Sequence, residues 1–405
     1  MRIVYLHQYF NTPAQSGSTR SYEFARRLAG RGHDVHMITS DRDPSGDERA
    51  WTVTPMEGFH VHSKSVAYDN SMTPLQRIRA FVTFALASAR LARELRADVI
   101  YATSTPLTIF LPAWYAVAGR KTPIVFEVRD SWPTVPIALG YLSNPIAQRL
   151  ARALERKAYR KSAHVVTLSP GMAEDAIAHG ADPDEITVIP NAADVELFDV
   201  DPALGRAWRE SNAIASDAPL VVYTGTFGAA NEVEFLVEVA SEAVKIDPRV
   251  TFVLIGTGAR FEAVRDRAQK FGLLDGCVRI LPPVPKAEIP SVLSAADITT
   301  SVVTDNPAMN ANSANKFFDS LAAGRAIAIN HEGWQADLIR THEIGLVLDR
   351  TDIPGSAARL VAFAGDETVR RSAHRNARAL AREKFLRDDL ASQLADTLEA
   401  VDVRR

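Results

Sequence analysis

The sequence predicts an α/β protein with two Rossmann-like domains, each containing a doubly wound parallel sheet. Three observations predict this fold. Short apolar runs rich in β-branched residues alternate with helical patterns along the whole chain. Most of these runs are apolar throughout, which is typical of strands buried on both faces by helices. The length of 405 residues suits two domains of ordinary size.

The first half of the chain opens with an apolar run at 2–6. A small-residue turn follows, and then a helical pattern over 22–31, which Gly32 ends. Further strands are expected at 34–39, 53–63, 99–102, 124–128, 164–168 and 187–189. This alternation predicts an N-terminal domain over residues 1–195.

The second half repeats the alternation after a linker near 191–203. Strands are expected at 220–223, 250–255, 278–281, 298–303 and 326–329. They predict a C-terminal domain over 196–380, followed by a C-terminal helix over 381–405 that packs back toward the N-terminal domain. Two such domains are expected to face each other across a cleft, with ligands at the carboxyl ends of the strands.

Composition and charge exclude several classes of protein. The net charge of -3 argues against a nucleic-acid partner. The charge is positive over the first 195 residues and negative over the rest, which indicates either an anionic partner on the first half or an unplanned scatter of surface charge. The single cysteine, Cys277, excludes an intrachain disulfide and a multi-cysteine zinc site. The apolar run at 3–6 is too short for a secretory signal, and the apolar stretch 80–89 is shorter than a bilayer span and has an arginine on each side. We therefore expect a cytoplasmic protein.

The turn after the first strand carries the first candidate site residues. Ser16, Gly17 and Ser18 lead into a helix that begins near Arg20. A small-residue turn at a helix start presents backbone N–H groups and the positive end of the helix dipole, which suits a phosphate or a sugar hydroxyl. The alternative is an ordinary tight turn between a strand and a helix, since the segment is not a complete G-x-G-x-x-G motif.

Two glycine turns follow strands of the second half. Gly225 and Thr226 come after the strand at 220–223, and Gly256, Gly258 and Arg260 come after the strand that ends at residue 255. Glycine lets the backbone approach a ligand closely. Two such turns at strand ends in one domain indicate a site for a nucleoside diphosphate.

The segment 310–325 carries the strongest local signal. Polar residues lead into a short helix that carries Asn315, Lys316 and Asp319, and Gly324 ends it. A lysine near a helix N-terminus opposes the helix dipole unless an anion lies nearby. Lys316 and Asp319 are three residues apart and therefore share a face. The alternative is a surface ion pair on a helix.

Taken together, these motifs resemble those of the retaining family-4 glycosyltransferases of the GT-B fold. The resemblance runs almost from end to end, through residues 32–35, 166–171, 188–198, 223–225, 252–258, 295–297 and 316–324. The segments 127–133 and 315–319 resemble a subgroup that builds bacterial O-antigen, capsule and related surface glycans. Some members of that subgroup are similar to transferases of N-acetylated deoxyhexosamines such as fucosamine.

The resemblance implies a reaction and its partners. A sugar, expected to be an N-acetylated hexosamine or deoxyhexosamine, would pass from a nucleotide donor, expected to be a UDP-sugar, to a glycan or polyprenyl-diphosphate acceptor. The anomeric configuration would be retained, and neither a metal nor another cofactor would be required. The N-terminal domain would bind the acceptor. In the C-terminal domain Lys316 and Arg260 would hold the diphosphate, and Asp319 would bind the ribose.

Three positions depart from the family pattern. Ala311 stands where members commonly carry the first acid of a Glu-x7-Glu pair, and Arg129 stands where a histidine often precedes the aspartate. The turn 225–231 lacks the arginine and lysine that many members use for the diphosphate. On the acceptor side the candidate catalytic residues are Asp130, Arg129 and His7, the last because it ends the first strand. A cap or an ion-pair partner of Arg129 is the alternative role for Asp130.

Two stretches, 74–96 and 141–161, combine helical apolar spacing with clusters of arginine and lysine. Such helices bind anionic membrane surfaces, so the protein is expected to be peripheral on the inner face of the cell membrane. The alternative is that both are crossover helices with buried apolar faces. Two alternatives to the transferase also stay open: a nucleotide-sugar 2-epimerase of the same fold, and a catalytically inactive scaffold subunit of a glycan-assembly complex.

Overall fold

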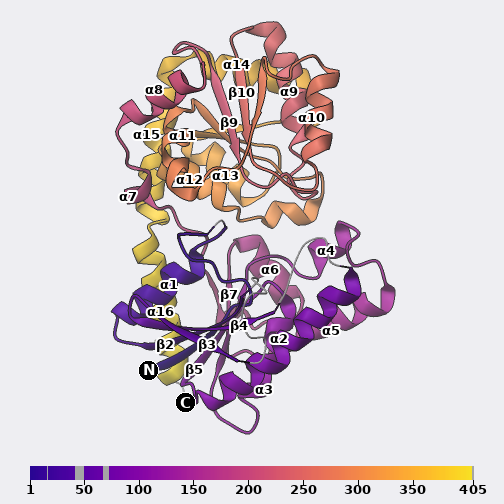
Figure 1. Cartoon of the computed structure of the whole chain (residues 1–405), viewed down its shortest axis with the longest axis vertical. Helices are drawn as coiled ribbons and strands as arrows, with labels where there is room; N and C mark the ends of the chain where they lie inside the picture. Colours follow the sequence, from indigo (N-terminus) through magenta and orange to yellow (C-terminus); the bar gives the residue numbers. More distant parts are fainter. Residues whose placement is uncertain (16, 42–49, 67–72, 404–405) are drawn as a thin grey trace. The chain divides into compact units, whose positions relative to one another are not determined.

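The computed structural model describes residues 1–15, 17–41, 50–66 and 73–403, which form two compact units (Figure 1). Unit 1 consists of Met1–Pro190 and Asp388–Arg405, and unit 2 of Asn191–Arg387. In each unit, helices cover both faces of a central sheet that is wholly or mostly parallel. The predicted fold class, two doubly wound α/β domains, is therefore confirmed.

The described part of unit 1 has an eight-stranded sheet in the order β3-β4-β2-β1-β5-β6-β7-β8. Its strands are β1 (Arg2–Leu6), β2 (Asp34–Asp41), β3 (Thr52–Met56), β4 (Phe59–Ser65), β5 (Val99–Thr103), β6 (Ile124–Val128), β7 (His164–Thr167) and β8 (Ile186–Val188). All neighbours are parallel except β3 and β4. The central strands β5 and β6 are buried along their whole length, as their apolar sequences predict.

The single strand expected at 53–63 is wrong. The structure has two antiparallel strands there, with Met56 paired to Phe59 across a two-residue turn. Both turn residues, Glu57 and Gly58, have positive φ, at 35° and 91°. This backbone is typical of a tight hairpin, because its twist matches that of the flanking strands. The Glu-Gly pair was the local signal for the turn.

The helices of unit 1 cover both faces of its sheet. They are α1 (Arg20–Gly30), α2 (Pro74–Glu94), η1 (Leu107–Ile109), α3 (Phe110–Ala116), α4 (Thr134–Ala138), α5 (Pro145–Lys161), α6 (Pro170–Ala178) and η2 (Pro183–Glu185). The chain returns to unit 1 through α16 (Arg387–Val403). Leu394 and Leu398 of α16 are fully buried, and Arg31 at the end of α1 pairs with Asp396 and Glu399. Burial of the apolar face supplies most of the stability at this contact, because exposed ion pairs contribute little.

Unit 2 has a wholly parallel sheet of six strands in the order β11-β10-β9-β12-β13-β14 among its described residues. The strands are β9 (Leu220–Thr224), β10 (Thr251–Ile255), β11 (Val278–Leu281), β12 (Ile298–Ser301), β13 (Ala326–Ile329) and β14 (Gly345–Val347). Alternate residues serve different cores: Leu220 and Val222 of β9 pack on one face, and Val221 and Tyr223 on the other. Each face buries its own cluster, which explains why the strands are continuously apolar.

The helices that cover the sheet of unit 2 are α7 (Val195–Phe198), α8 (Pro202–Ser211), α9 (Glu234–Ile246), α10 (Phe261–Lys270), η3 (Lys286–Glu288), α11 (Ile289–Ala295), η4 (Pro307–Ala311), α12 (Asn315–Ala322), α13 (Trp334–His342), α14 (Ile353–Gly365) and α15 (Glu367–Lys384). The short edge strand β14 escaped the sequence analysis, because three residues carry too little periodicity to distinguish them from a loop.

In each sheet the chain first adds strands on one side of its first strand in the parallel series and then crosses to the other side. This switch point lies between β1 and β5 in unit 1 and between β9 and β12 in unit 2. In open parallel sheets, ligands bind outside the carboxyl ends of the strands at such a point. The loops that follow β1, β5, β9 and β12 are therefore where a site is expected in each unit.

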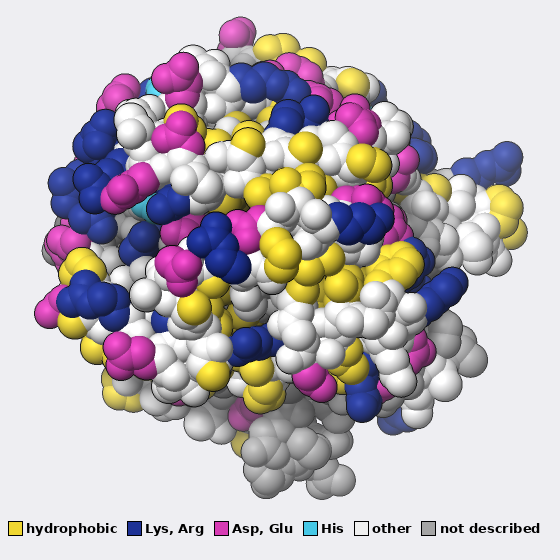
Figure 2. Space-filling view, turned by 90° about the horizontal axis from the view of Figure 1, so that it is seen from above, with side chains coloured by type: hydrophobic (Ala, Val, Ile, Leu, Met, Phe, Trp, Pro, Cys, Tyr) yellow, Lys and Arg dark blue, Asp and Glu magenta, His cyan; other side chains and the backbone are white. Residues whose placement is uncertain are grey.

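Surface and hydropathy add two observations. Acidic and basic side chains are interspersed on the face of the molecule that Figure 2 shows, so no continuous basic surface covers that face. Across the described ranges, no helix combines the length and the apolar character needed to span a bilayer.

Candidate functional site

The glycine turns of unit 2 are built by direct packing of one backbone against another. A Cβ on Gly256 would lie 1.8 Å from the carbonyl oxygen of Gly225, and a Cβ on Gly258 would lie 2.6 Å from that of Phe227. Both glycines also have positive φ, at 155° and 152°. No other residue fits at either position without displacing the neighbouring backbone. The turns after β9 and β10 therefore form one contiguous backbone surface at the carboxyl edge of the sheet.

Lys316 of α12 lies against this surface. A Cβ on Gly225 would be 3.0 Å from Cε of Lys316, so the lysine stem packs directly on the first turn. Its Nζ donates to the hydroxyl of Tyr223 at 3.2 Å and to Oδ1 of Asn231 at 3.4 Å. The Tyr223 hydroxyl donates in turn to the carbonyl oxygen of Thr226 at 2.8 Å. The structure thus brings together Lys316 and the Gly225 turn, which the sequence analysis placed in one site.

The ammonium group of Lys316 donates its hydrogen bonds to neutral groups. Within the part of the chain that the structure describes, its hydrogen-bond partners are a hydroxyl and an amide oxygen, and no carboxylate lies within ion-pair distance. Burial lowers the pKa of Lys316 to about 8, and Asp319 opposes that shift only in part. A half-buried ammonium group without a counter-charge favours binding of an anion.

Asp319 lies one turn further along α12 and is also half-buried. Burial raises its pKa to about 6. The positive charges of Lys286 and Arg387 oppose this shift, whereas Asp194 reinforces it. Asp194 itself pairs with Arg387 through both carboxylate oxygens, so those two charges largely neutralise each other. Asp319 is thus a second incompletely neutralised group on the same helix.

The other predicted donor-site residues differ in exposure and in their partners. Asn315 is the first residue of α12 and is exposed, and Thr226 is exposed in the turn after β9. Ala314, the residue before α12, provides no side-chain cap. Arg260 donates from Nε to Oε1 of Glu234 at 2.7 Å, so its guanidinium is already paired. Lys316 is therefore the cation least committed to a protein partner among the predicted donor residues.

In unit 1, a second group of polar side chains lies at the carboxyl ends of β1 and β6. Arg129 contacts Nε2 of His7 at 3.2 Å and donates to Oγ of Ser18 at 3.0 Å. Because a guanidinium only donates, Nε2 of His7 accepts in this contact. His7 is buried, whereas Arg129 is half-buried. The structure therefore brings three residues predicted from separate motifs into one hydrogen-bonded group.

Asp130 follows Arg129 and is exposed. Its Oδ2 accepts a hydrogen bond from Oγ1 of Thr105 at 2.8 Å, and Thr105 lies just beyond β5. Asp130 is thus an available carboxylate beyond β6, which pairs with β5 beside the switch point of the first sheet, and it is held by one neutral hydroxyl. The sequence analysis missed Thr105, since a threonine in a loop carries no motif.

Arg20 and Glu127 form a buried ion pair beneath this group. Nε of Arg20 donates to Oε1 of Glu127 at 2.9 Å, and the two side chains are 2% and 0% exposed. Arg20 also donates to the carbonyl oxygens of Ile189 and Pro190. Burial alone would raise the pKa of Glu127, but the charges of Arg20 and Arg129 hold it below its usual value. Arg20 thus contacts protein groups rather than solvent, and Glu127 was read from the sequence as part of the 127–133 motif only.

Two predicted residues of the first turn complete the description. Gly17 has a φ of 123°, and a Cβ there would lie 2.8 Å from Nδ2 of Asn11, so the turn requires glycine. Ser16 lies outside the described residues.

Comparison with known families accounts for both units. A model described as a glycosyl transferase 4-like domain matches residues 17–192, and a model described as glycosyl transferases group 1 matches residues 218–366. Together the two matches cover most of the chain.

Curated relatives are similar to parts of the chain. A D-inositol 3-phosphate glycosyltransferase from Corynebacterium efficiens is 28% identical over 205 residues, which are 48% of this chain and 47% of that protein. In this alignment the chain spans about half the length of the relative. A protein of the same name from Corynebacterium diphtheriae is 24% identical over 81% of this chain and 76% of its own length.

Solved structures share the fold over the whole chain. Sucrose-phosphate synthase from Thermosynechococcus elongatus has a TM-score of 0.82 at 15% identity and covers 100% of both chains. Anabaena HepE in complex with UDP-glucose has a TM-score of 0.74 at 18% identity, covering 99% and 100% of the two chains. WaaG, described as a glycosyltransferase involved in lipopolysaccharide biosynthesis, has a TM-score of 0.73 at 16% identity, covering 98% and 99%.

Proposed function

Since the chain belongs to the glycosyltransferases of the GT-B fold, we propose that it transfers a sugar from a nucleoside diphosphate to a glycan or polyprenyl-diphosphate-linked acceptor. The transfer retains the anomeric configuration, needs no metal, and serves surface polysaccharide assembly. One observation carries the donor half of this proposal: Lys316 is a half-buried cation without a carboxylate partner, packed on a glycine turn at the carboxyl edge of its sheet.

The chemistry of a nucleotide-sugar donor needs such a group. As the glycosidic bond to the diphosphate breaks, negative charge develops on the leaving oxygen, and fixed cations and N–H groups lower the barrier by stabilising it. Lys316 supplies the cation, and the backbone of the turns at Gly225 and Gly256 allows the diphosphate to approach closely. Asp319 accepts hydrogen bonds from the ribose. HepE, a structural neighbour, was solved with UDP-glucose, which supports a UDP-sugar as donor.

The acceptor side of the proposal rests on unit 1. Asp130 is exposed and held only by the Thr105 hydroxyl, so it is free to accept a hydrogen bond from an incoming acceptor hydroxyl. Arg129, which follows β6 together with Asp130, contacts His7 at the end of β1, and the two side chains orient the same substrate. Retention by attack on the face from which the leaving group departs needs no second carboxylate of the glycosidase kind.

The identity of the sugar and of the acceptor is the finer part of the proposal. An N-acetylated hexosamine or deoxyhexosamine is proposed from the segments 127–133 and 315–319, and the neighbour WaaG acts in lipopolysaccharide biosynthesis. The curated relatives named D-inositol 3-phosphate glycosyltransferase favour a second acceptor class, a phosphorylated polyol.

A transfer assay separates these possibilities. The purified full chain is incubated with a panel of UDP-, GDP- and dTDP-sugars and with either a polyprenyl-diphosphate-linked sugar or inositol phosphate, with and without EDTA, well below its unfolding temperature. We expect transfer from a UDP-N-acetylhexosamine to the polyprenyl-linked acceptor, insensitive to EDTA, with the product anomer matching the donor by NMR. Transfer only to inositol phosphate would overturn the acceptor class, and an inverted anomer would overturn retention. Absence of transfer and hydrolysis with every donor would favour a scaffold.

Peripheral membrane binding is proposed on the outward faces of α2 and α5. On α5, Ile146 and Leu150 are 67% and 68% exposed beside the exposed Arg149. On α2, Leu86 is 70% exposed and lies four residues before the exposed Arg90. Core packing does not account for these exposed leucine and isoleucine side chains, and basic amphipathic faces of this kind bind anionic lipid.

Vesicle co-sedimentation tests the membrane proposal. Reversal of Arg90 and Arg149 to glutamate is expected to reduce binding to anionic vesicles by about 1 kcal/mol per removed charge, or more because of the reversal. High salt is expected to act in the same direction, and UDP binding to stay unchanged. Wild-type protein that fails to sediment with anionic vesicles, or sediments equally at high salt, would contradict the proposal.

A further inference from the structure

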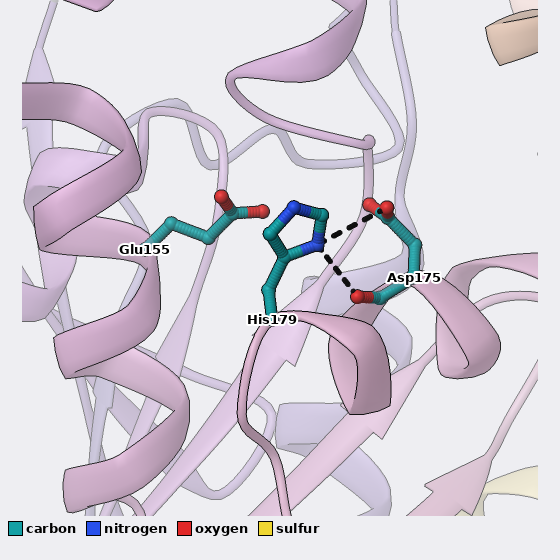
Figure 3. Close-up of side chains that lie close together, drawn as sticks. All are labelled: Glu155, Asp175 and His179. Atoms are coloured by element: carbon teal, nitrogen blue, oxygen red, sulfur yellow. Dashed lines mark hydrogen bonds and ion pairs between the residues drawn. The ribbon is translucent and has the colours of Figure 1, made fainter. Parts of the chain in front are cut away.

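Three side chains of unit 1 that the proposed reaction does not use lie close together: Glu155 of α5, Asp175 of α6, and His179 at the end of α6 (Figure 3). One ligand atom from each lies within 4.8 Å of the others. Figure 3 shows the carboxylate of Glu155 facing the imidazole of His179, with Asp175 on the other side of the ring. The three residues belong to unit 1, whereas Lys316 and Asp319 belong to unit 2.

The imidazole of His179 is held in place through its Nδ1 atom. Its Nδ1 lies 2.8 Å from the backbone carbonyl oxygen of Asp175 and 3.3 Å from Oδ1 of the same residue. A proton on Nδ1 that is donated to a carbonyl leaves the lone pair on Nε2 and holds the ring in place. Histidine ligands of protein-bound metals are oriented in this way by their second nitrogen. The ring edge with Nε2 is the one that faces Glu155.

Glu155 supplies an independent observation. Its side chain is 0% exposed, and Oε2 has no hydrogen-bond partner, while Oε1 receives only a 3.4 Å contact from the hydroxyl of Tyr159. A buried carboxylate oxygen without a partner is unfavourable unless the group is protonated or a cation is bound.

We propose that Glu155 and Nε2 of His179 bind a divalent transition metal ion, for which Zn²⁺ is the best match, as a structural clamp between α5 and α6, while Asp175 holds the imidazole at its Nδ1 atom. An imidazole nitrogen and the carboxylate of Glu155 are ligands that Zn²⁺ accepts, with water in the remaining positions. The carboxylates of Glu155 and Asp175 together balance the charge of the ion. The positive charge of Arg152, which acts on Glu155, lies near the proposed ion and opposes its binding.

The experiment uses the full chain after removal of metal by a chelator and dialysis. ZnCl₂ is titrated against a competing chromophoric chelator, and the midpoint of thermal unfolding is followed in parallel. We expect one tight Zn²⁺ site per chain and a rise in the midpoint with Zn²⁺, since a ligand that binds only the folded state stabilises it. Co²⁺ in the same site is expected to show the visible absorption of low-symmetry, four-coordinate cobalt.

The variants distinguish this site from other histidines. Glu155→Gln and His179→Gln are each expected to weaken Zn²⁺ binding at least tenfold and to abolish the rise in the unfolding midpoint. The matched control is His62→Gln, because Nε2 of His62 lies 2.9 Å from Nδ1 of His36 in the same unit. This control is expected to leave the tight site intact.

Unfolding of the metal-free variants checks that each folds. Glu155→Gln removes a buried carboxylate, so its metal-free form is expected to be at least as stable as the wild type. Equal Zn²⁺ affinity in wild type, Glu155→Gln and His179→Gln would overturn the proposal. Loss of the tight site in His62→Gln, or no tight site in the wild type, would overturn it as well.

Discussion

The two units differ in whether their buried charges have an ion-pair partner. In unit 1, Arg20 and Glu127 are almost wholly buried, and each is satisfied by the other and by neighbouring hydrogen-bond partners. The pKa of Glu127 is accordingly held below its usual value. In unit 2, Lys316 and Asp319 are half-buried without an ion-pair partner among the described residues, and burial shifts both pKa values toward the neutral forms, to about 8 and about 6.

A buried charge that has a partner and one that lacks a partner are expected to have different roles. A buried pair whose hydrogen bonds are complete holds the fold in one arrangement, and removal of one member leaves the other uncompensated. A charge left without a partner destabilises the folded protein until a ligand of opposite charge arrives. The pair in unit 1 is therefore expected to support stability, and the groups in unit 2 to support binding.

The largest expected effect is on the structural pair. Glu127→Gln leaves the guanidinium of Arg20 buried without its carboxylate and is expected to lower the free energy of unfolding by about 3–5 kcal/mol. Urea denaturation of the full chain measures this change. Arg90→Gln, which removes an ion pair with Glu94 between exposed side chains, is the control and is expected to change stability by less than about 0.5 kcal/mol. Equal unfolding midpoints for the two variants would remove the distinction between the units.

The next effect is on binding. Lys316→Met is expected to weaken UDP binding by about 1.5–3 kcal/mol, the range for a hydrogen bond to a charged group, and to leave uridine binding nearly unchanged. Calorimetry with both ligands measures the two losses. Stability of the ligand-free protein is expected to stay the same or rise, opposite to the result for Glu127→Gln. Equal losses for UDP and uridine would show that Lys316 does not contact the diphosphate.

The pKa of Lys316 predicts a pH dependence of smaller size. Because burial lowers this pKa to about 8, the lysine loses its proton between pH 7 and pH 9 in the free protein. UDP favours the charged form, so its affinity is expected to fall by about tenfold over this interval. Lys316→Arg keeps its charge at both pH values and is expected to bind UDP with little pH dependence. The same pH dependence in the arginine variant would assign the titration to another group.

The smallest effect concerns Asp319. Its pKa in the folded protein is raised to about 6, above the value of 3.8 for the free side chain, so the stability associated with its neutral form is present below pH 4 and lost as the pH rises through 6. Asp319→Asn is therefore expected to raise the free energy of unfolding at pH 7 by about 1 kcal/mol, allowing for partial exposure, and by less at pH 4. Urea titrations at both pH values measure the difference. A variant that is less stable than the wild type at pH 7 would show that the carboxylate is satisfied in the folded protein.

Local sequence determined the elements of both sheets. A run such as Leu220–Thr224 predicts a buried strand because its apolar character is visible within five residues, and both faces of that strand are indeed covered. The glycines after β9 and β10 were equally readable, since a turn with positive φ needs a specific residue at a specific place. The hairpin at Glu57 and Gly58 was missed because the sequence analysis followed the longer strand pattern, whereas the two turn residues decide the fold there.

The tertiary structure alone decided the state of each charge. In the sequence, Glu127 is one polar residue in an apolar strand, and its pairing with Arg20 joins positions 107 residues apart. The availability of Lys316 depends on Tyr223 and Asn231, which come from other segments, and the cluster at Glu155 needs two helices to meet. Burial and electrostatic interaction are sums over neighbours that are distant along the chain, so no local pattern contains them. The sequence therefore indicated which turns and helices to examine for a ligand site, and the fold decided which of their charges lack an ion-pair partner among the described residues.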